Sequence, residues 1–401
     1  MTVDRMRSTE NDSSHDAAHA ESAATGTEVA VVLTGGGARA AYQVGFLKCL
    51  AQNMPDARLP IITGVSAGAI NAAYLAAHQG TMGKAVEGLE DLWAHLDPET
   101  IYRVGTVPLL GNVLRWGLRL FSGGARPLPE PESILDVTPL RELLNRTLET
   151  VDGEIVGIRQ NLESGRLKAL ALSTLRYSTG QTVTWVQGRD FDAWERPRRI
   201  GIRTRIRIEH VMASAALPLM FPAVEIGDSW YGDGGIRLAA PLAPAIHLGA
   251  DRILAIATRQ RKTVEEASEP SFIGYPPPAQ VAGTMLNAAF LDAIDQDAEN
   301  LRRINRVLDH IPQRSYADLR PIRTMVLRPS EDLGRMAADF EVKLPRAFRF
   351  FTRGWGTRET RSPDFLSLLM FQSDYLRELI AIGQRDAQAR IEEIKQLFAQ
   401  A

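Results

Sequence analysis

Short apolar runs alternate with helical patterns along the chain. Residues 29–34 are typical of a buried strand, and apolar residues recur at helical spacing over 39–52. The segment LPIITGVSAGAINAAYLAAH repeats this order with a β-branched run, a tight turn and an alanine-rich helix. Further strands are predicted at 167–174, 182–187, 223–226, 252–257 and 322–327. The alternation favours an α/β sandwich around a largely parallel sheet.

The distribution of these signals divides the chain into three parts. Residues 1–28 are polar and lack aromatic side chains, so we expect a disordered tail. Strand signals concentrate in residues 29–258, which we interpret as the core domain. Residues 259–401 begin with an exposed polar stretch and then show long helical patterns at 285–307 and 367–399. We interpret this last part as a mainly helical extension or cap.

Composition indicates an ordinary globular protein. The chain of 401 residues is 45% hydrophobic and 23% charged, and its net charge of −2 gives no reason to expect a nucleic-acid partner. Cys49 is the only cysteine, which excludes an intramolecular disulfide and a cysteine-rich metal cluster. The sequence has no run of about 18 apolar residues and no secretory h-region. We therefore expect a cytoplasmic protein whose contact with a membrane would be peripheral.

Three adjacent glycines, Gly35 to Gly37, separate the first predicted strand from the first helix. With Ala40 they match the G-x-G-x-x-G/A pattern of a dinucleotide-binding loop. Such a site also needs an acidic residue at the end of the next strand, whereas Asp56 lies before that strand. This departure argues against nucleotide binding.

A second strand–turn–helix junction carries the pentapeptide GVSAG, from Gly64 to Gly68. It matches the G-x-S-x-G nucleophile elbow, in which a serine on a sharp turn projects its hydroxyl above the sheet. The small flanking residues allow backbone segments to approach one another. A purely structural turn is the alternative, but the strand and helix on either side favour Ser66 as a nucleophile.

A nucleophilic serine needs donors for the oxyanion that forms on its substrate. Backbone N–H groups without side chains around them can form such a concavity at the start of a helix, where the helix dipole also favours negative charge. We therefore predict an oxyanion hole at the glycine loop, with an arginine as a nearby positive charge. Its members would be Gly35, Gly36, Gly37, Ala38 and Arg39.

The nucleophile also needs a base. None of the seven histidines lies in the loop setting that a catalytic triad favours, and His247, in a helical pattern, is the candidate for a conventional triad. Asp233 ends a short β-like run and is followed by Gly234 and Gly235, which permit close backbone approach. The Asp-Gly-Gly turn taken alone could have a purely structural role. With the glycine loop and the elbow, it indicates that Asp233 is the partner of Ser66.

The ordered motifs GGGARA, GVSAG and DGG resemble the patatin-like phospholipase family, whose members use a Ser–Asp dyad. The segment ASAALPLMFPAVEI is similar to the part of the family that precedes the aspartate. The resemblance covers about residues 29–250 and implies a three-layer α/β/α sandwich with a mostly parallel sheet, in which residues 29–258 form the catalytic domain. Ala40 departs from the glycine of many members, which restricts any conformation with positive φ there.

What this resemblance implies is a hydrolase of phospholipid or related lipid esters. Ser66 would attack the ester, Asp233 would accept its proton, and no metal or organic cofactor would be needed. Two alternatives stay open: a catalytically silent lipid- or partner-binding scaffold of the same fold, and a triad hydrolase that uses His247. The lipid headgroup, the acyl chain length and the oligomeric state are not indicated by the sequence.

Three segments bear on contact with a lipid surface. Residues 107–121, VPLLGNVLRWGLRLF, are typical of either an interfacial amphipathic helix or a cap helix. Residues 345–361 interleave aromatics with arginines, which favours an anionic lipid surface or a polar seam between domains. The basic run 196–207 is interpreted as a solvated loop and strand edge.

Overall fold

The structure is a computed structural model that describes residues 28–103, 135–218, 220–261, 293–312, 319–340 and 364–399, together with residues 265, 268, 275 and 281. The tail predicted at 1–28, apart from its last residue, and the segments 107–121, 285–292 and 345–361 lie outside the described residues.

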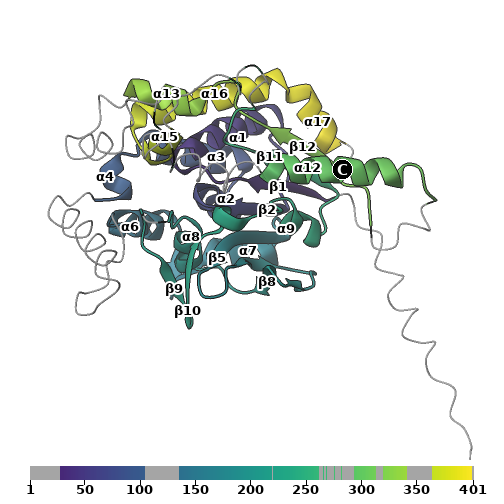
Figure 1. Ribbon diagram of the computed structural model, residues 1–401, viewed down its shortest axis with the longest axis horizontal. Helices are drawn as coiled ribbons and strands as arrows, with labels where there is room; N and C mark the ends of the chain where they lie inside the picture. Colours follow the sequence, from purple (N-terminus) through teal and green to yellow (C-terminus); the bar gives the residue numbers. More distant parts are fainter. Residues whose placement is uncertain are drawn as a thin grey trace, which may run out of the picture.

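A ten-stranded sheet forms the centre of the molecule (Figure 1). Its main path runs β12-β11-β1-β2-β5-β6-β8-β7, and β10, paired with β9, joins β5. The strands are β1 (Val29–Leu33), β2 (Ile61–Val65), β5 (Ala169–Arg176), β6 (Gln181–Gly188), β7 (Glu195–Arg196), β8 (Arg199–Arg203), β9 (Val224–Ile226), β10 (Ser229–Asp233), β11 (Arg252–Ile256) and β12 (Arg323–Leu327). A separate small sheet pairs β3 (Thr150–Val151) with β4 (Glu154–Ile155).

Parallel pairing joins the strands at the centre of this mixed sheet. β12, β11, β1, β2 and β5 are parallel neighbours, while β5 turns back into antiparallel β6. Every residue of β1, β2 and β11 is buried, as expected for parallel strands covered on both faces. The loops that follow β1 and β2 leave the same edge of the sheet, which brings the two glycine-rich turns together.

Helices cover both faces of the sheet. The α-helices are α1 (Ala41–Asn53), α2 (Ala67–Ala77), α3 (Met82–Ala94), α4 (Pro98–Ile101), α6 (Thr138–Thr147), α7 (Val156–Glu163), α8 (Ile208–Ser214), α9 (Ala243–His247), α12 (Ala293–Leu308), α13 (Leu333–Phe340), α15 (Asp364–Leu369), α16 (Ser373–Ala389) and α17 (Ile391–Ala399). Two 3-10 helices, η1 (Gly37–Ala40) and η2 (Gly234–Arg237), follow β1 and β10. In the described part of the chain, no helix combines the length and apolarity needed to cross a bilayer.

Alternate residues of β1 show the three layers directly. Val31 and Leu33 belong to a hydrophobic core that includes residues of α1, α2 and α16, whereas Ala30 and Val32 belong to a second core with residues of α9 and α12. Side chains of a strand alternate between its faces, so the two cores lie on opposite sides of the sheet. The predicted fold class, an α/β sandwich with a helical C-terminal region, is confirmed.

The C-terminal third of the chain is built into this sandwich. β12 extends the sheet by pairing with β11, and α16 crosses α1 closely. A Cβ at Gly45 would overlap the carbonyl oxygen of Ile380, and one at Gly383 would overlap that of Tyr42, so both glycines permit this crossing. The helical pattern predicted at 367–399 is interrupted between α15, α16 and α17. The division of the chain at residue 258 stays a prediction.

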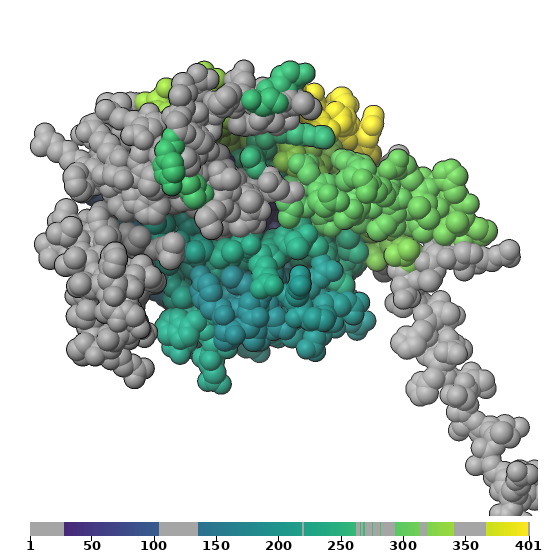
Figure 2. Space-filling view, viewed as in Figure 1, coloured from purple at the N-terminus to yellow at the C-terminus, as the bar shows by residue number. Residues whose placement is uncertain are grey.

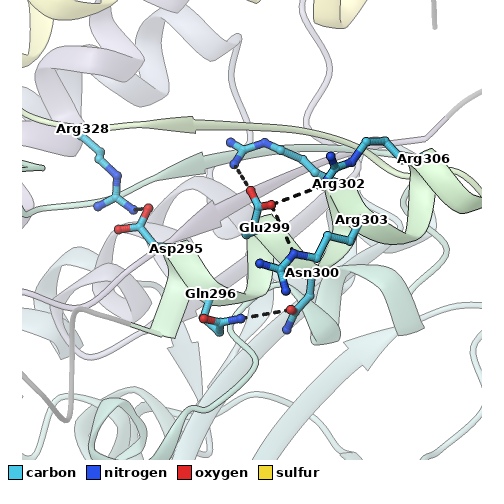
Figure 3. A network of polar contacts seen from close by, with 8 residues as sticks. All are labelled: Asp295, Gln296, Glu299, Asn300, Arg302, Arg303, Arg306 and Arg328. Carbon is cyan, nitrogen blue, oxygen red and sulfur yellow. Dashed lines mark hydrogen bonds and ion pairs between the residues drawn. The ribbon is translucent and has the colours of Figure 1, made fainter.

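Helix α12 illustrates how charge is distributed at the surface. Its buried side chains are Ile294, Ala298, Leu301 and Leu308, and the first three belong to the second core of the sheet. On its exposed side Glu299 forms ion pairs with three arginines, Arg302, Arg303 and Arg306, and Arg328 of the loop after β12 pairs with Asp295 at 2.6 Å (Figure 3). The helix lies at the surface of the molecule (light green in Figure 2), so these pairs add little to stability.

Candidate active site

Ser66 lies at the turn between β2 and α2, as the elbow motif predicts. Its φ of 58° and ψ of −136° are unusual for a residue with a side chain, and it is 5% exposed. Such a conformation persists only where the surroundings enforce it, and it is a feature of functional sites. A Cβ at Gly64 would lie 2.6 Å from the carbonyl oxygen of Gly68, and one at Gly68 would overlap the backbone of Leu33. The turn therefore requires both glycines.

Each of the three loop glycines is approached by a different segment of the chain. A Cβ at Gly35 would lie 2.9 Å from the Cβ of Ser66, and one at Gly36 would overlap the side chain of Thr258. Gly37 has a φ of +54°, and a Cβ there would overlap the carbonyl oxygen of Leu368. The three positions lack side chains because Ser66, the loop after β11 and the C-terminal helix α15 all pack against this loop.

Buried amide side chains hold the loop after β1 through hydrogen bonds. Gln43 of α1 donates through Nε2 to the carbonyl oxygens of Thr34, at 2.8 Å, and Ile256, at 3.2 Å. Asn71 of α2 donates to Gln43 Oε1 and accepts from the indole N–H of Trp93 at 2.7 Å. Gln43 and Asn71 are fully buried, so this hydrogen-bonded chain ties the loop after β1 to helices α1, α2 and α3.

Strand β5 brings Asp233 to Ser66. On one edge of β5, β2 pairs with its first five residues, ending with Val65 opposite Ser173. β10 pairs with the next three, ending with Asp233 opposite Thr174. β6 pairs with the full length of β5 along one edge. β2 and β10 therefore lie one after the other along the opposite edge of β5. The residue after Val65 is Ser66, and the two predicted partners therefore meet where the two strands end.

Burial sets the charge state of Asp233. The residue is fully buried, and this desolvation raises the pKa of its carboxyl from 3.8 to about 7, while hydrogen bonding by the Ser66 side chain and by the Gly235 N–H lowers it. Asp233 Oδ1 accepts from the Gly235 N–H at 2.9 Å. Asp233 Oδ2 is buried and accepts no hydrogen bond of standard length and angle from the described residues, so the Ser66 hydroxyl influences this carboxyl without such a bond. A carboxylate with a pKa near 7 is a suitable general base at neutral pH.

Gly234 shows why two glycines follow the aspartate. A Cβ at this position would overlap the carbonyl oxygen of Ser173 in β5. The chain therefore passes directly against β5 as it leaves β10, and Gly235 then donates to the Asp233 side chain.

Arg39 is buried and bonded to the C-terminal region. Its side chain is 1% exposed, and Nε donates to Ser367 Oγ at 2.6 Å. The guanidinium thus connects η1 to helix α15, whereas Ala38 is buried in the core and does not line the pocket described next. Membership of Gly35, Gly36, Gly37, Ala38 and Arg39 in an oxyanion hole stays a prediction.

A largely apolar pocket opens on Ser66. One wall is formed by Gly36, Gly37, Ser66 and Ala67, and another by Leu368, Leu369 and Phe371. The other lining residues are Ile70, Ile101, Leu140, Ala215, Leu217 and Phe221. The hydroxyl of Tyr102 donates to the Leu369 carbonyl oxygen at 2.8 Å, which fixes the second wall. The arrangement can place an apolar chain beside a nucleophilic hydroxyl.

His247 and His210 have partners away from Ser66. His247 stacks on Trp194 with ring centroids 4.5 Å apart, at the end of α9. Burial, and then nearby arginines, lower the pKa of this imidazole. His210 accepts a hydrogen bond from the Arg207 backbone N–H, and burial lowers its pKa to about 4. Neither lines the pocket at Ser66. Within the described ranges, no three His, Cys, Asp or Glu side chains gather as metal ligands.

Comparison with known proteins places the chain in a family. The pattern of the family described as Patatin-like phospholipase matches residues 31–246, more than half of the chain. The chain belongs to the patatin-like phospholipase family. No match was found among curated protein sequences.

Solved structures of similar fold include human GIVD cytosolic phospholipase A2 in complex with methyl gamma-linolenyl fluorophosphonate. This comparison has a TM-score of 0.45 and 15% identity over 93% of this chain and 59% of the human one, so this chain spans less than two thirds of the human protein. VipD from Legionella pneumophila gives a TM-score of 0.32 and 15% identity over 93% of this chain and 76% of that chain.

Sequence reasoning misses several residues of the site. Ser214 contacts the nucleophile turn, although only its segment, ASAALP, is singled out by its resemblance to the family. Thr258, whose hydroxyl donates to the Gly35 carbonyl oxygen at 2.6 Å, and the wall formed by Leu368 and Phe371 have no comparable signal. Their place at the site depends on pairing between distant segments.

Proposed function

We propose that this chain is a serine acyl-ester hydrolase that acts on phospholipids or related lipid esters. The observation that carries the proposal is the meeting of a strained, nearly buried serine with a fully buried carboxylate whose pKa is about 7. The apolar pocket that opens on Ser66 supports an acyl chain as the part of the substrate that is held. Membership in the family supports lipid acyl hydrolysis as the reaction class.

In the first half-reaction, Ser66 Oγ forms a bond to the ester carbonyl carbon while the Asp233 carboxylate takes the hydroxyl proton. The carbonyl electron pair moves to oxygen, and backbone N–H groups of the loop at Gly36 and Gly37 hold this oxyanion. One such donor lowers the barrier by about 2.7–4 kcal/mol. The oxyanion then collapses, the ester C–O bond breaks, and the alcohol leaves with the proton from Asp233.

Water completes the cycle. Asp233, again a carboxylate, removes a proton from a water molecule whose oxygen attacks the acyl group on Ser66. The second oxyanion is held by the same backbone groups, and its collapse releases the fatty acid. The proton returns to Ser66 Oγ. No metal or organic cofactor has a step in this scheme. Because its substrate lies in a lipid aggregate, the enzyme would meet it by peripheral contact with the lipid surface.

The experiment compares the wild-type protein with Ser66→Ala, using phosphatidylcholine vesicles with and without anionic lipid and a soluble short-chain ester. Ser164→Ala is the matched control, because Ser164 is an exposed serine at the end of α7. We expect Ser66→Ala to remove hydrolysis and labelling by an alkyl fluorophosphonate, with Ser164→Ala unchanged. A wild-type protein that binds vesicles but neither hydrolyses ester nor accepts the label would support the silent scaffold instead.

A further inference from the structure

The end of helix α8 contacts both partners of the proposed reaction. Ser214, its last residue, is fully buried, and its Oγ accepts a hydrogen bond from the Ser66 backbone N–H at 3.1 Å. Two residues later, the carbonyl oxygen of Ala216 accepts from the Asp233 backbone N–H at 3.0 Å. One short segment therefore holds the backbone of the nucleophile and the backbone of the base.

The direction of the hydrogen bonds at Ser214 is fixed. Its single hydroxyl proton is donated to the carbonyl oxygen of Ser173 at 2.7 Å, which leaves its lone pairs to accept from Ser66. Ser173 is the β5 residue opposite Val65, and its carbonyl oxygen also lies against Gly234. The Ser214 hydroxyl is thus anchored at the point of β5 where β2 and β10 meet.

The Ser66 N–H has a particular need for such an acceptor. It lies at the N-cap of α2, where no earlier helical carbonyl is available, and β2 has ended at Val65. A buried N–H without a partner is strongly unfavourable, and the positive φ of Ser66 must be enforced by its surroundings. The Ser214 hydroxyl oxygen accepts the hydrogen bond from this N–H and so also holds the Ser66 backbone in its positive-φ conformation.

We propose that Ser214 is a positioning residue: its hydroxyl locks the Ser66 turn onto β5 and so keeps the Ser66 side chain aligned with Asp233. This inference rests on the proposed function, but the lock is a property of the folded chain that can be measured without any substrate. A mispositioned nucleophile loses rate rather than substrate affinity, since reacting atoms must lie in near-attack geometry.

Three variants test the proposal. Ser214→Ala removes the hydroxyl, and Ser214→Thr keeps it. Thr184→Val is the matched control, because it deletes another buried hydroxyl, which lies 3.3 Å from Ser173 Oγ on the β6 side. The measurements are kcat and KM on a soluble ester, the rate of Ser66 labelling by an alkyl fluorophosphonate, thermal stability, and hydrogen exchange of the Ser66 amide.

For Ser214→Ala we expect kcat and the labelling rate to fall by up to about 100-fold with KM little changed, and amide exchange at Ser66 to accelerate. Ser214→Thr should recover much of the rate, and Thr184→Val should behave as wild type. The proposal is overturned if folded Ser214→Ala keeps its kcat and labelling rate, or if Thr184→Val loses as much. It is also overturned if the Ser66 amide of Ser214→Ala exchanges as slowly as in the wild type, whether or not the protein hydrolyses lipids. A wild-type protein without activity or labelling would refute the proposed function alone.

Discussion

The two walls of the pocket at Ser66 differ in what they are made of and where they come from. The wall with Gly36, Gly37 and Ser66 consists of backbone and one hydroxyl, and it lies within residues 31–246, which match the family. The wall with Leu368 and Phe371 is apolar and lies far beyond that range. The proposed chemistry thus belongs to the first wall, whereas the shape of the space beside it also depends on the second.

The two walls are nonetheless in direct contact. Gly37 packs against the Leu368 carbonyl, and Arg39 donates to Ser367. A change confined to one wall should therefore alter mainly rate or mainly selectivity, and a change at their contact should alter both activity and stability.

The largest effect is expected from Asp233→Asn. The amide cannot accept the Ser66 proton, so hydrolysis should fall by about 10²–10⁴-fold while the pocket keeps its shape. Asp228→Asn, at an exposed residue in the turn between β9 and β10, serves as the control. Steady-state hydrolysis of a soluble ester checks the expectation, and near-wild-type turnover by Asp233→Asn would remove the carboxylate from the mechanism.

Gly37→Ala tests the contact between the walls. The added Cβ would overlap Leu368 and oppose a φ of +54°, so we expect a loss of roughly 1–3 kcal/mol in the free energy of unfolding and a fall of about 10²–10³-fold in rate if an oxyanion donor moves. Gly165→Ala separates the two causes, because Gly165 has a φ of +72° and a Cβ there would meet no atom of the described residues within 4 Å. Equal losses in the two variants would mean that contact with Leu368 is unimportant.

The pH dependence probes the carboxyl beside the first wall. Asp233 acts as a base only when ionised, and because burial raises the pKa of its carboxyl to about 7, kcat/KM should rise about tenfold per pH unit below that value and then level off. The folded state holds this proton between pH 3.8 and about 7 while the unfolded chain has released it, so this group makes folding stability fall as pH rises through that interval. Denaturant titrations of wild type and Asp233→Asn should differ in this slope, and parallel slopes would contradict the raised pKa.

The smallest effect is expected from Phe371→Leu in the apolar wall. Phe371 packs beside Trp93 and Tyr102, and the smaller side chain should enlarge the pocket at a cost of about 1 kcal/mol in stability. The ratio of kcat/KM for long over short acyl esters should rise by up to about tenfold. Phe398→Leu makes the same change at a buried position in α17 outside the pocket and should leave the ratio unaltered.

Local pattern is enough to find the elements that carry Ser66 and Asp233. Both residues follow short strands and lie next to small residues, so a few neighbouring positions specify each turn, and the fold class needs only the rule that apolar runs alternate with helices. The same local reasoning shows that the glycine loop is unusual. It cannot identify Thr258 and Leu368 as the residues that pack against the glycines of this loop, because those residues approach from distant parts of the chain.

Arg39 shows most clearly what local sequence pattern cannot predict. A positive charge next to a predicted oxyanion hole suggests a role toward substrate, but the side chain bonds to Ser367, a residue that no local signal connects with it. Likewise the uniform helical pattern over 367–399 gives no sign that α15 ends at Leu369 and that the chain then lines the pocket. Apolar periodicity reports which face is buried and says nothing about what is buried against it.

The shared edge of β5 has a consequence for how the protein acquires reactivity during synthesis. A growing chain that contains β2 and β5 can shape the serine turn, but it lacks the proposed proton acceptor, Asp233, until β10 has been made and has paired. In the proposed mechanism the Ser66 hydroxyl therefore stays inert until β10 has paired, and the apolar wall of the pocket is added only when Leu368 and Phe371 dock. Premature chains would carry the serine without the means to attack lipids.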